Sequence, residues 1–280
     1  MMPWFIWNGK NSLGDFGLWI NKLPPIVRAQ ERVTNIQIPG RPGTVTMTEG
    51  EDVYDAVERK CVILARNSMN IQPVLEWLRG SGELIVSNEA DKVYFARIAA
   101  DVTFSRISND LQQATVVFYC QPLKGKRYPE TFSFTSDGSI FNPGDVASRP
   151  MVMVTGSGDK TAWIAGNRMK FYNMEGTLKV DCDAQVILAH TDAYDANRYY
   201  YKGDYCIASS KLYTFTASGT GSTLVSGGKR VEVEDWDGSE FDYIWPGEFK
   251  GEFWKIPRGT CTVTRSASAS LEIIPRWRWV

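Results

Sequence analysis

The acidic pair Asp181 and Asp183 is the first arrangement in this sequence that could do chemistry, because the two carboxylates flank Cys182. Residues i and i+2 of a β-strand point to the same side, so the pair could bind a metal ion or serve as the two carboxylates of a glycosidase. A solvated strand end accounts for the same residues more simply. We therefore rank hydrolysis of a glycan below the non-catalytic functions.

A second acidic cluster lies further along the chain, where Asp235, Asp237 and Asp242 could supply oxygen ligands to calcium. Their spacing does not match an EF-hand loop, and a polar turn is the simpler interpretation. His190 is the single histidine of the sequence, and there is no Gly-x-Ser-x-Gly motif to mark a nucleophilic serine. The sequence therefore predicts no catalytic residue, no metal site and no cofactor.

The composition limits the partners of the protein. Its 280 residues include 31 basic and 32 acidic side chains, which gives a net charge of −1 and no general attraction to nucleic acid or to an anionic membrane. The five cysteines are far apart and lack a Cys-x-x-Cys spacing, which favours reduced, buried thiols. The sequence shows neither a signal peptide nor the ~18 apolar residues of a membrane-spanning helix, so we expect a protein made in a cytoplasm.

Most of the chain shows the short, turn-bounded segments that are typical of β-strands. A polar, turn-rich stretch at 133–150 indicates a junction between two domains, which we place at 1–135 and 136–280. One stretch, 68–82, departs from the strand pattern and predicts a helix. Its apolar residues recur at helical spacing at Ile71, Val74, Leu75 and Leu78.

The chain ends in an alternation of arginine and tryptophan. On a strand, Trp277 and Trp279 would share one face, and Arg276 and Arg278 the other. The simplest interpretation is the last strand of a sandwich in the second domain, with its indoles buried.

Residues 191–244 interrupt the second domain with about fifty residues rich in Tyr, Asp, Ser and Gly. Loops longer than ~15 residues without structure of their own are uncommon in compact domains. We therefore expect a small β module inserted into the sandwich. Its Gly- and Ser-rich passage at 218–228 indicates a flexible segment.

Several of these pieces, in this order, resemble the siphophage distal tail proteins (Dit). "FIWNGKNSLGDFGLWI", "IQIPGRPGTV", "VLEWLRGSGELIVSN" and "KVYFARI" are similar to the N-terminal domain of that family. "IFNPGDVASRPMVMVTGSGD", "LKVDCDAQVI", "FWKIPRGTCTVT" and "LEIIPRWRW" are similar to its C-terminal half. The resemblance implies a mainly β protein, in which a β-rich ring domain with one α-helix precedes a galectin-like β-sandwich that here carries the small β insertion.

The same resemblance implies a structural role and no catalytic residue. Dit subunits form a homo-hexameric ring at the virion tail tip, which is assembled in the cytoplasm of the bacterial host. The ring joins the tail tube protein to the tail-associated lysin or spike and to the receptor-binding protein. This role involves neither a membrane nor sequence-specific binding of nucleic acid.

A closed ring requires two different complementary patches on each subunit. We place one of them at 38–45, where "IPGRPG" is expected to form a rigid, extended segment because proline restricts φ and lacks a backbone N–H. The predicted interface residues are Ile38, Pro39, Arg41, Pro42 and Val45.

The inserted stretch "YYYKGDYCIASSKLYTFTA" is similar to the core of small chitin- and cellulose-binding modules. Aromatic rings can stack on the flat faces of sugars, so the resemblance implies binding of cell-wall polysaccharide. About half of the aromatic residues of so small a module are expected to form its own core. The candidate sugar-binding residues are Tyr200, Tyr201, Tyr205, Tyr213 and Trp236.

Two other functions stay open at this stage. The protein could be a carbohydrate-binding adhesion protein, in which the inserted module is the functional part and the remainder is scaffold. It could also be a tail-associated glycan hydrolase that uses Asp181 and Asp183.

Overall fold

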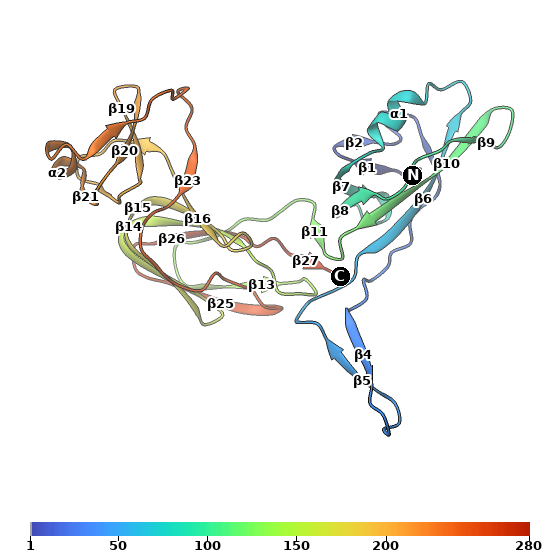
Figure 1. The fold of residues 1–280 in the computed structure, drawn as a ribbon, viewed down its shortest axis with the longest axis horizontal. Coiled ribbons are helices and arrows are strands. Elements are labelled where there is room, and N and C mark those ends of the chain that lie inside the picture. Colours follow the sequence, from blue (N-terminus) through green and yellow to red (C-terminus); the bar gives the residue numbers. More distant parts are fainter. Residues whose placement is uncertain (1) are drawn as a thin grey trace. The chain divides into compact units, whose positions relative to one another are not determined.

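The computed structural model describes residues 2–280, and strands dominate it, which confirms the prediction of a mainly β fold (Figure 1). The chain divides into two compact units. The first contains the residues up to Tyr128 together with Trp277–Val280, and the second contains Pro129–Arg276. The expected junction at 135/136 thus lies a few residues beyond the observed one, and the last four residues belong to the first unit.

The first unit is built on a ten-stranded sheet with the order β2-β1-β7-β8-β10-β6-β3. These strands are β1 (Phe5–Trp7), β2 (Lys10–Asn11), β3 (Trp19–Lys22), β6 (Val57–Arg66), β7 (Ser81–Val86), β8 (Lys92–Ile98) and β10 (Leu111–Cys120). Three short strands join it, β9 (Ser105–Arg106), β11 (Lys124–Lys126) and β27 (Arg278–Trp279). The longest ladder is antiparallel and joins β6 to β10 over the full length of both strands.

Helix α1 (Gln72–Trp77) confirms the predicted helix, although it is shorter than the pattern. The side chain of Asn70 accepts a hydrogen bond from the backbone N–H of Gln72 at 3.2 Å, and Pro73 occupies the first turn, where its missing N–H costs nothing. A short 3₁₀ helix, η1 (Ser87–Glu89), follows β7.

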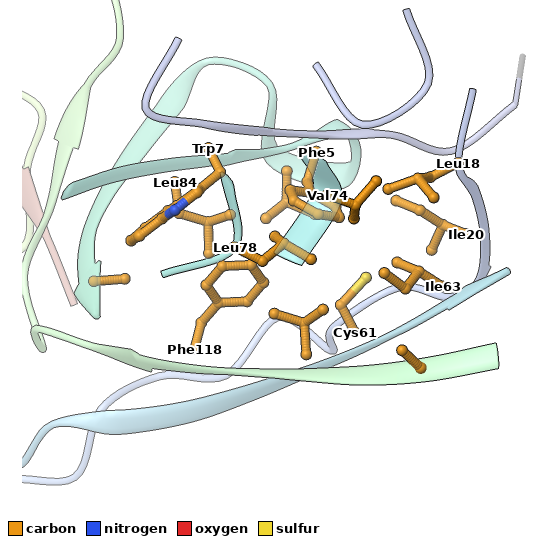
Figure 2. Packing of buried hydrophobic residues seen from close by; sticks show 14 of the residues in the cluster. Phe5, Trp7, Leu18, Ile20, Cys61, Ile63, Val74, Leu78, Leu84 and Phe118 are labelled. Carbon is orange, nitrogen blue, oxygen red and sulfur yellow. The ribbon is translucent and has the colours of Figure 1, made fainter. Parts of the chain in front are cut away.

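The core of the first unit lies between α1 and the inward faces of the strands (Figure 2). Cys61 and Ile63 of β6 point inward at alternate positions, as the two-residue period of a strand requires. The helix contributes Val74, and Trp77 stacks on Phe5 with ring centroids 5.4 Å apart. Apolar burial from local and distant segments thus fixes the helix on the sheet.

The C-terminal strand differs from the prediction. β27 pairs with β11 in the first unit, and Lys92 Nζ lies 3.3 Å from the ring centroid of Trp279. The last strand of the second unit is instead β26 (Ser270–Ile274), and Arg276, with φ of 53°, follows it at the turn. The interpretation of the terminal Trp residues as part of the sandwich is therefore wrong, although Trp277 is buried.

The second unit contains a nine-stranded sheet organised by two long strands, β14 (Met151–Ile164) and β15 (Asn167–Asp181). A two-residue turn, Ala165–Gly166, joins them, and both residues have positive φ, as in the type I′ turns that favour hairpins. The other strands are β12 (Phe132–Phe134), β13 (Gly138–Asn142), β16 (Val186–His190), β23 (Asp242–Ile244), β24 (Phe249–Gly251), β25 (Gly259–Arg265) and β26.

The inserted module leaves this sheet after β16 and returns to it at β23, and these two strands pair directly with each other. The module contains β17 (Asp192–Ala193), β18 (Tyr199–Tyr200), β19 (Tyr205–Ala208), β20 (Lys211–Phe215), β21 (Gly219–Thr220), α2 (Gly221–Ser226) and β22 (Arg230–Glu232). The passage at 218–228 therefore contains a helix, and its interpretation as a flexible segment is wrong. No helix in residues 2–280 is long and apolar enough to cross a membrane.

Candidate functional site

The first unit carries an exposed hairpin of β4 (Val33–Gln37) and β5 (Thr44–Thr48), which we call the arm. The two strands pair only with each other within the described chain, and they extend away from the rest of their unit (Figure 1). Nearly every residue of the arm is exposed. A lone two-stranded hairpin is at best marginally stable in water, so the arm is suited to binding a partner.

The two faces of the arm differ, because alternate residues of a strand point to opposite sides. The face with Ile36, Val45 and Met47, which we call the apolar face, includes Thr34, and the other face is polar except for Val33. Ile36 is paired with Val45, and Met47 lies on the same face two residues later. Ile36 is 43% exposed and Met47 is 55% exposed. Val45 is one of the predicted interface residues; Ile36 and Met47 lie beside it on this face and are not among them, although the alternation of Ile36 with Ile38 and of Val45 with Met47 was a signal for an apolar face.

The tip of the arm carries the other predicted interface residues, Ile38, Pro39, Arg41 and Pro42. The backbone N–H of Arg41 donates to the carbonyl of Ile38 at 3.1 Å, and Gly40 has φ of 80°. Pro at the second and Gly at the third position are typical of a type II turn. The prediction of an extended segment is therefore wrong, and these side chains lie on an exposed turn.

In the inserted module, Tyr200 is a core residue, with an exposed fraction of 0%. Its ring stacks on Phe215 at 4.2 Å, in a small cluster with Cys206 and Leu224. The Tyr200 hydroxyl accepts a hydrogen bond from the backbone N–H of Asp195 at 2.9 Å, and burial raises the pKa of Tyr200 to about 12. This ring is enclosed and offers no face to a ligand.

Tyr201 holds the module against the rest of the second unit. Its hydroxyl donates to the backbone carbonyl of Tyr172 at 2.5 Å, and its ring is nearly perpendicular to that of Trp245, with centroids 5.6 Å apart. Tyr205 packs edge-on against Tyr243 at 5.0 Å. Both candidates are half-buried and make internal contacts.

Tyr213 and Trp236 remain partly accessible. The guanidinium of Arg230 lies 4.2 Å from the ring centroid of Tyr213 and covers one face of the ring. The Trp236 indole N–H donates to the carbonyl of Ser239 at 2.8 Å, which orients the ring within the 233–241 loop. Of the five aromatic candidates, Tyr200 is thus in the module core. Tyr201 and Tyr205 contact aromatic residues outside the module, and Tyr213 and Trp236 are the two that remain.

Asp204 explains the Gly-Asp pair of the motif. Its buried carboxylate accepts hydrogen bonds from the backbone N–H of Tyr201 at 2.6 Å and from the hydroxyl of Tyr243 at 3.1 Å. Burial raises the pKa of Asp204, and these hydrogen bonds oppose that effect. Gly203 precedes it with φ of 95°, at the turn into β19. This aspartate joins the module to the sheet and was missed as a structural residue.

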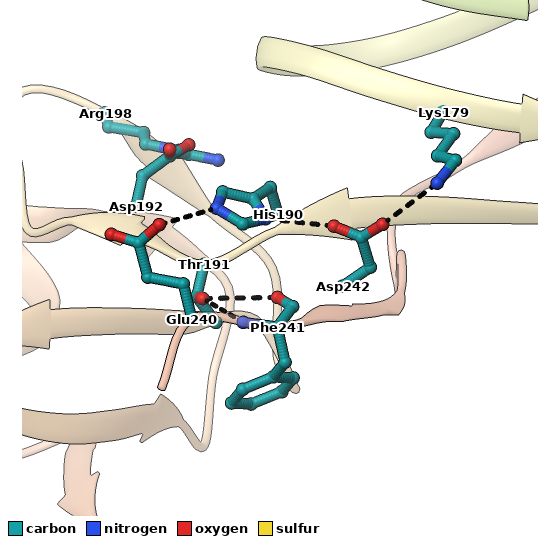
Figure 3. A network of polar contacts seen from close by, with 8 residues as sticks. All are labelled: Lys179, His190, Thr191, Asp192, Arg198, Glu240, Phe241 and Asp242. Carbon is teal, nitrogen blue, oxygen red and sulfur yellow. Dashed lines mark hydrogen bonds and ion pairs between the residues drawn. The ribbon is translucent and has the colours of Figure 1, made fainter. Parts of the chain in front are cut away.

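The neck of the module, residues 190–192 and 240–242, contains the single histidine (Figure 3). Nδ1 of His190 lies 2.9 Å from a carboxylate oxygen of Asp242, and Nε2 lies 3.2 Å from one of Glu240. A neutral imidazole can donate from only one nitrogen, so the charged form satisfies both contacts. Hydrogen bonds to Asp242 and then to Glu240 raise the pKa of His190.

Asp181 and Asp183, the carboxylate pair considered for catalysis, lie at the end of β15, where Asp181 makes contacts that stabilise the fold. Asp181 ends β15 and receives both guanidinium nitrogens of Arg276 at 2.8 and 2.9 Å, as well as the backbone N–H of Asp183. The Arg276 hydrogen bonds hold the pKa of Asp181 at about 2. Asp242 belongs to the neck, and no cluster of three or more metal-ligating side chains occurs in residues 2–280.

Comparison with known proteins gives a match in structure. The fold matches that of the SPP1 Dit protein (gp 19.1) over 100% of both chains, with a TM-score of 0.64 and 12% sequence identity. That structure is described as a paradigm of the hub adsorption apparatus in phages that infect Gram-positive bacteria. No protein-family model and no curated protein matches the sequence. The chain therefore has a Dit-like fold.

Proposed function

We propose that this protein is a structural hub subunit of a phage tail tip. The observation that carries the proposal is the end-to-end match in fold to the SPP1 Dit protein, which is described as a paradigm of the hub adsorption apparatus. The exposed, amphipathic arm supports it, because a permanent assembly would cover the apolar face.

In the proposed assembly, six copies form a closed ring. The arm of one copy packs on a different patch of its neighbour, since a ring requires heterologous contacts. The apolar face of the arm makes this contact together with the tip residues Ile38, Pro39, Arg41 and Pro42. The ring forms in the cytoplasm of the host and connects the tail tube protein to the tail-associated lysin or spike and to the receptor-binding protein.

Light scattering after size-exclusion chromatography and negative-stain electron microscopy of the full chain test this proposal. We expect particles of six subunits with a central opening. A protein that stays monomeric at every concentration up to its solubility limit would contradict the proposed role.

For the inserted module we propose binding of a host cell-wall polysaccharide. The position of the module supports this, because β16 and β23 pair without it and it is therefore an addition to the sheet. Trp236, which is half-buried on the 233–241 loop, is the aromatic residue that would contact sugar rings, with Tyr213 beside the module core as the second candidate. Tyr200 takes no part in the proposed site.

Replacing residues 191–241 with Asn-Gly would join His190 to Asp242 by a hairpin turn, since these residues are paired in the sheet. We expect the shortened chain to lose polysaccharide binding in pull-down assays and to retain the ring. A monomer that binds polysaccharide through the module would instead favour the carbohydrate-binding adhesion protein. Cell-wall turnover that Asp183→Asn abolishes would favour the hydrolase.

A further inference from the structure

The arm is joined to the sheet on two sides, through β3 and through β6, and the connection from β3 contains an irregular segment, residues 23–29, which we call the waist. The ladder between β3 and β6 ends where Lys22 pairs with Val62. Pro24 and Pro25 follow, and neither has the N–H needed to continue the ladder. The waist is therefore the place where the arm would bend if nothing else held it.

In place of backbone hydrogen bonds of a strand ladder, the waist receives hydrogen bonds from side chains in the body of the first unit, Arg59 and Asn88. Arg59 donates from Nη1 to the carbonyl of Pro25 at 3.0 Å and from Nη2 to the carbonyl of Val27 at 3.2 Å. Asn88 donates to the carbonyl of Pro24 at 3.0 Å. Carbonyls of the waist thus face the body, while the side chain of Ile26 points outward and is 58% exposed.

Arg59 is itself held firmly. It is 3% exposed, its guanidinium lies 4.1 Å from the ring centroid of Tyr94, and Nη1 lies 3.9 Å from a carboxylate oxygen of Glu89. The same carboxylate group accepts hydrogen bonds from Tyr94 and from Lys124, the latter at 2.8 Å. Arg59 therefore belongs to a buried polar network, not to a flexible surface.

The position of Arg59 on β6 makes its burial informative. The next inward-facing residues of this strand, Cys61 and Ile63, are apolar core residues, and an apolar side chain at position 59 would continue that core. Burying a guanidinium is costly unless it makes strong hydrogen bonds. The carbonyls of Pro25 and Val27 in the waist are among the acceptors that offset the cost of burying the Arg59 guanidinium.

Beyond the waist, the two sides of the arm are tied together. The backbone N–H of Asp55 donates to the carbonyl of Gln30 at 2.9 Å, and Nε of Arg32 donates to the carboxylate of Asp55 at 2.8 Å. Bending at the waist would therefore move the arm as one piece.

We propose that Arg59 is the positioning residue of the arm: by holding the Pro25 and Val27 carbonyls it locks the waist and sets the direction in which the arm projects. The lock is a property of the single chain. Its consequence for ring formation rests on the proposed function, because only an arm in a defined direction can reach the same patch on every neighbour.

Limited proteolysis with trypsin tests the lock, since the waist contains an exposed tryptic site after Arg28. Arg59→Met keeps the length of the side chain and removes its donors. All proteins in this assay also carry Ile36→Asp, so that self-association does not shield the waist. We expect Arg59→Met to accelerate cleavage after Arg28 about tenfold, which corresponds to about 1.4 kcal/mol of opening free energy. The matched control, Arg97→Met, removes an exposed arginine of the same sheet and should leave the rate unchanged.

Asn88→Ala is the second variant, because Asn88 is an exposed residue and its loss should not unfold the unit. We expect it to accelerate cleavage about threefold without a change in the thermal melting of the protein. Equal cleavage rates for Asn88→Ala, Arg59→Met and the parent protein would overturn the proposal.

Ring formation is then measured without the Ile36→Asp change. A wild-type ring that Arg59→Met weakens would support both the lock and its role in assembly. A monomeric wild type whose waist Arg59→Met still opens would refute the proposed function and leave the lock standing.

Discussion

The apolar face of the arm can be tested with a single charge. Ile36→Asp places a carboxylate in the middle of this face, and Asn35→Asp places the same charge on the opposite face of the same strand. Asn35 accepts a hydrogen bond from the hydroxyl of Thr46 at 2.6 Å, and an aspartate at position 35 would retain that acceptor. The two variants therefore differ in the face that they alter.

The size of the effect follows from the exposure of Ile36. About two fifths of this residue is exposed, so covering it in an interface would contribute ~1 kcal/mol, a little under half the value for a whole apolar side chain. A carboxylate without a partner in the same contact would cost a further ~2 kcal/mol. The sum of ~3 kcal/mol predicts that each subunit contact is weakened ~150-fold by Ile36→Asp.

Light scattering across a series of protein concentrations measures this effect. We expect wild type and Asn35→Asp to form the same ring, and Ile36→Asp to remain monomeric at concentrations at which they assemble. All three should melt at the same temperature when monomeric, because Ile36 lies outside the core of the first unit. Equal association of Ile36→Asp and Asn35→Asp would refute the assignment of the apolar face to the interface.

Three further predictions concern the inserted module. The pKa of His190 is raised above its ordinary value of 6.5 by hydrogen bonds, first of all to Asp242, so the stabilisation of the neck is fully present below pH 6.5 and is lost as the pH rises through the folded-state pKa. An NMR titration of the imidazole should show the raised value, and Asp242→Asn should lower it. Tyr200→Ala should destabilise the module by about 3 kcal/mol, since it empties the centre of a small core, and calorimetry or hydrogen exchange of the module would measure the loss. Trp236→Ala should weaken polysaccharide binding at least fivefold without changing the melting temperature, and unchanged binding would remove this residue from the proposed site.

Local patterns in the sequence determined a large part of the fold. Alternating apolar residues and turn residues predicted a mainly β chain, and the helical spacing from Ile71 to Leu78 predicted α1. The unusual length and composition of 191–244 predicted an insertion within the second domain, and the structure places the module between two paired strands. These features follow from steric preferences and periodicity, which act between residues close in sequence.

The tertiary structure decided which faces are covered. Tyr200 and Trp236 looked equivalent in the sequence, yet the first is enclosed by Phe215 and Leu224 while the second lies on a loop. No local pattern could distinguish them, because burial depends on segments that approach from elsewhere in the chain. The same holds for the C-terminal strand, which pairs with a strand some 150 residues earlier.

Arg59 shows most clearly the difference between what the local sequence and what tertiary contacts determine. No sequence pattern assigned it a role, and in the structure it lies on β6 in phase with the apolar residues Cys61 and Ile63. Its function as an anchor arises only because Pro25 and Val27 pass within hydrogen-bonding distance of it. Sequence alone therefore determined the mainly β class and the helix α1. The contacts between distant segments decided which residues form the core and which lie on the surface, since burial and hydrogen bonding depend on those neighbours.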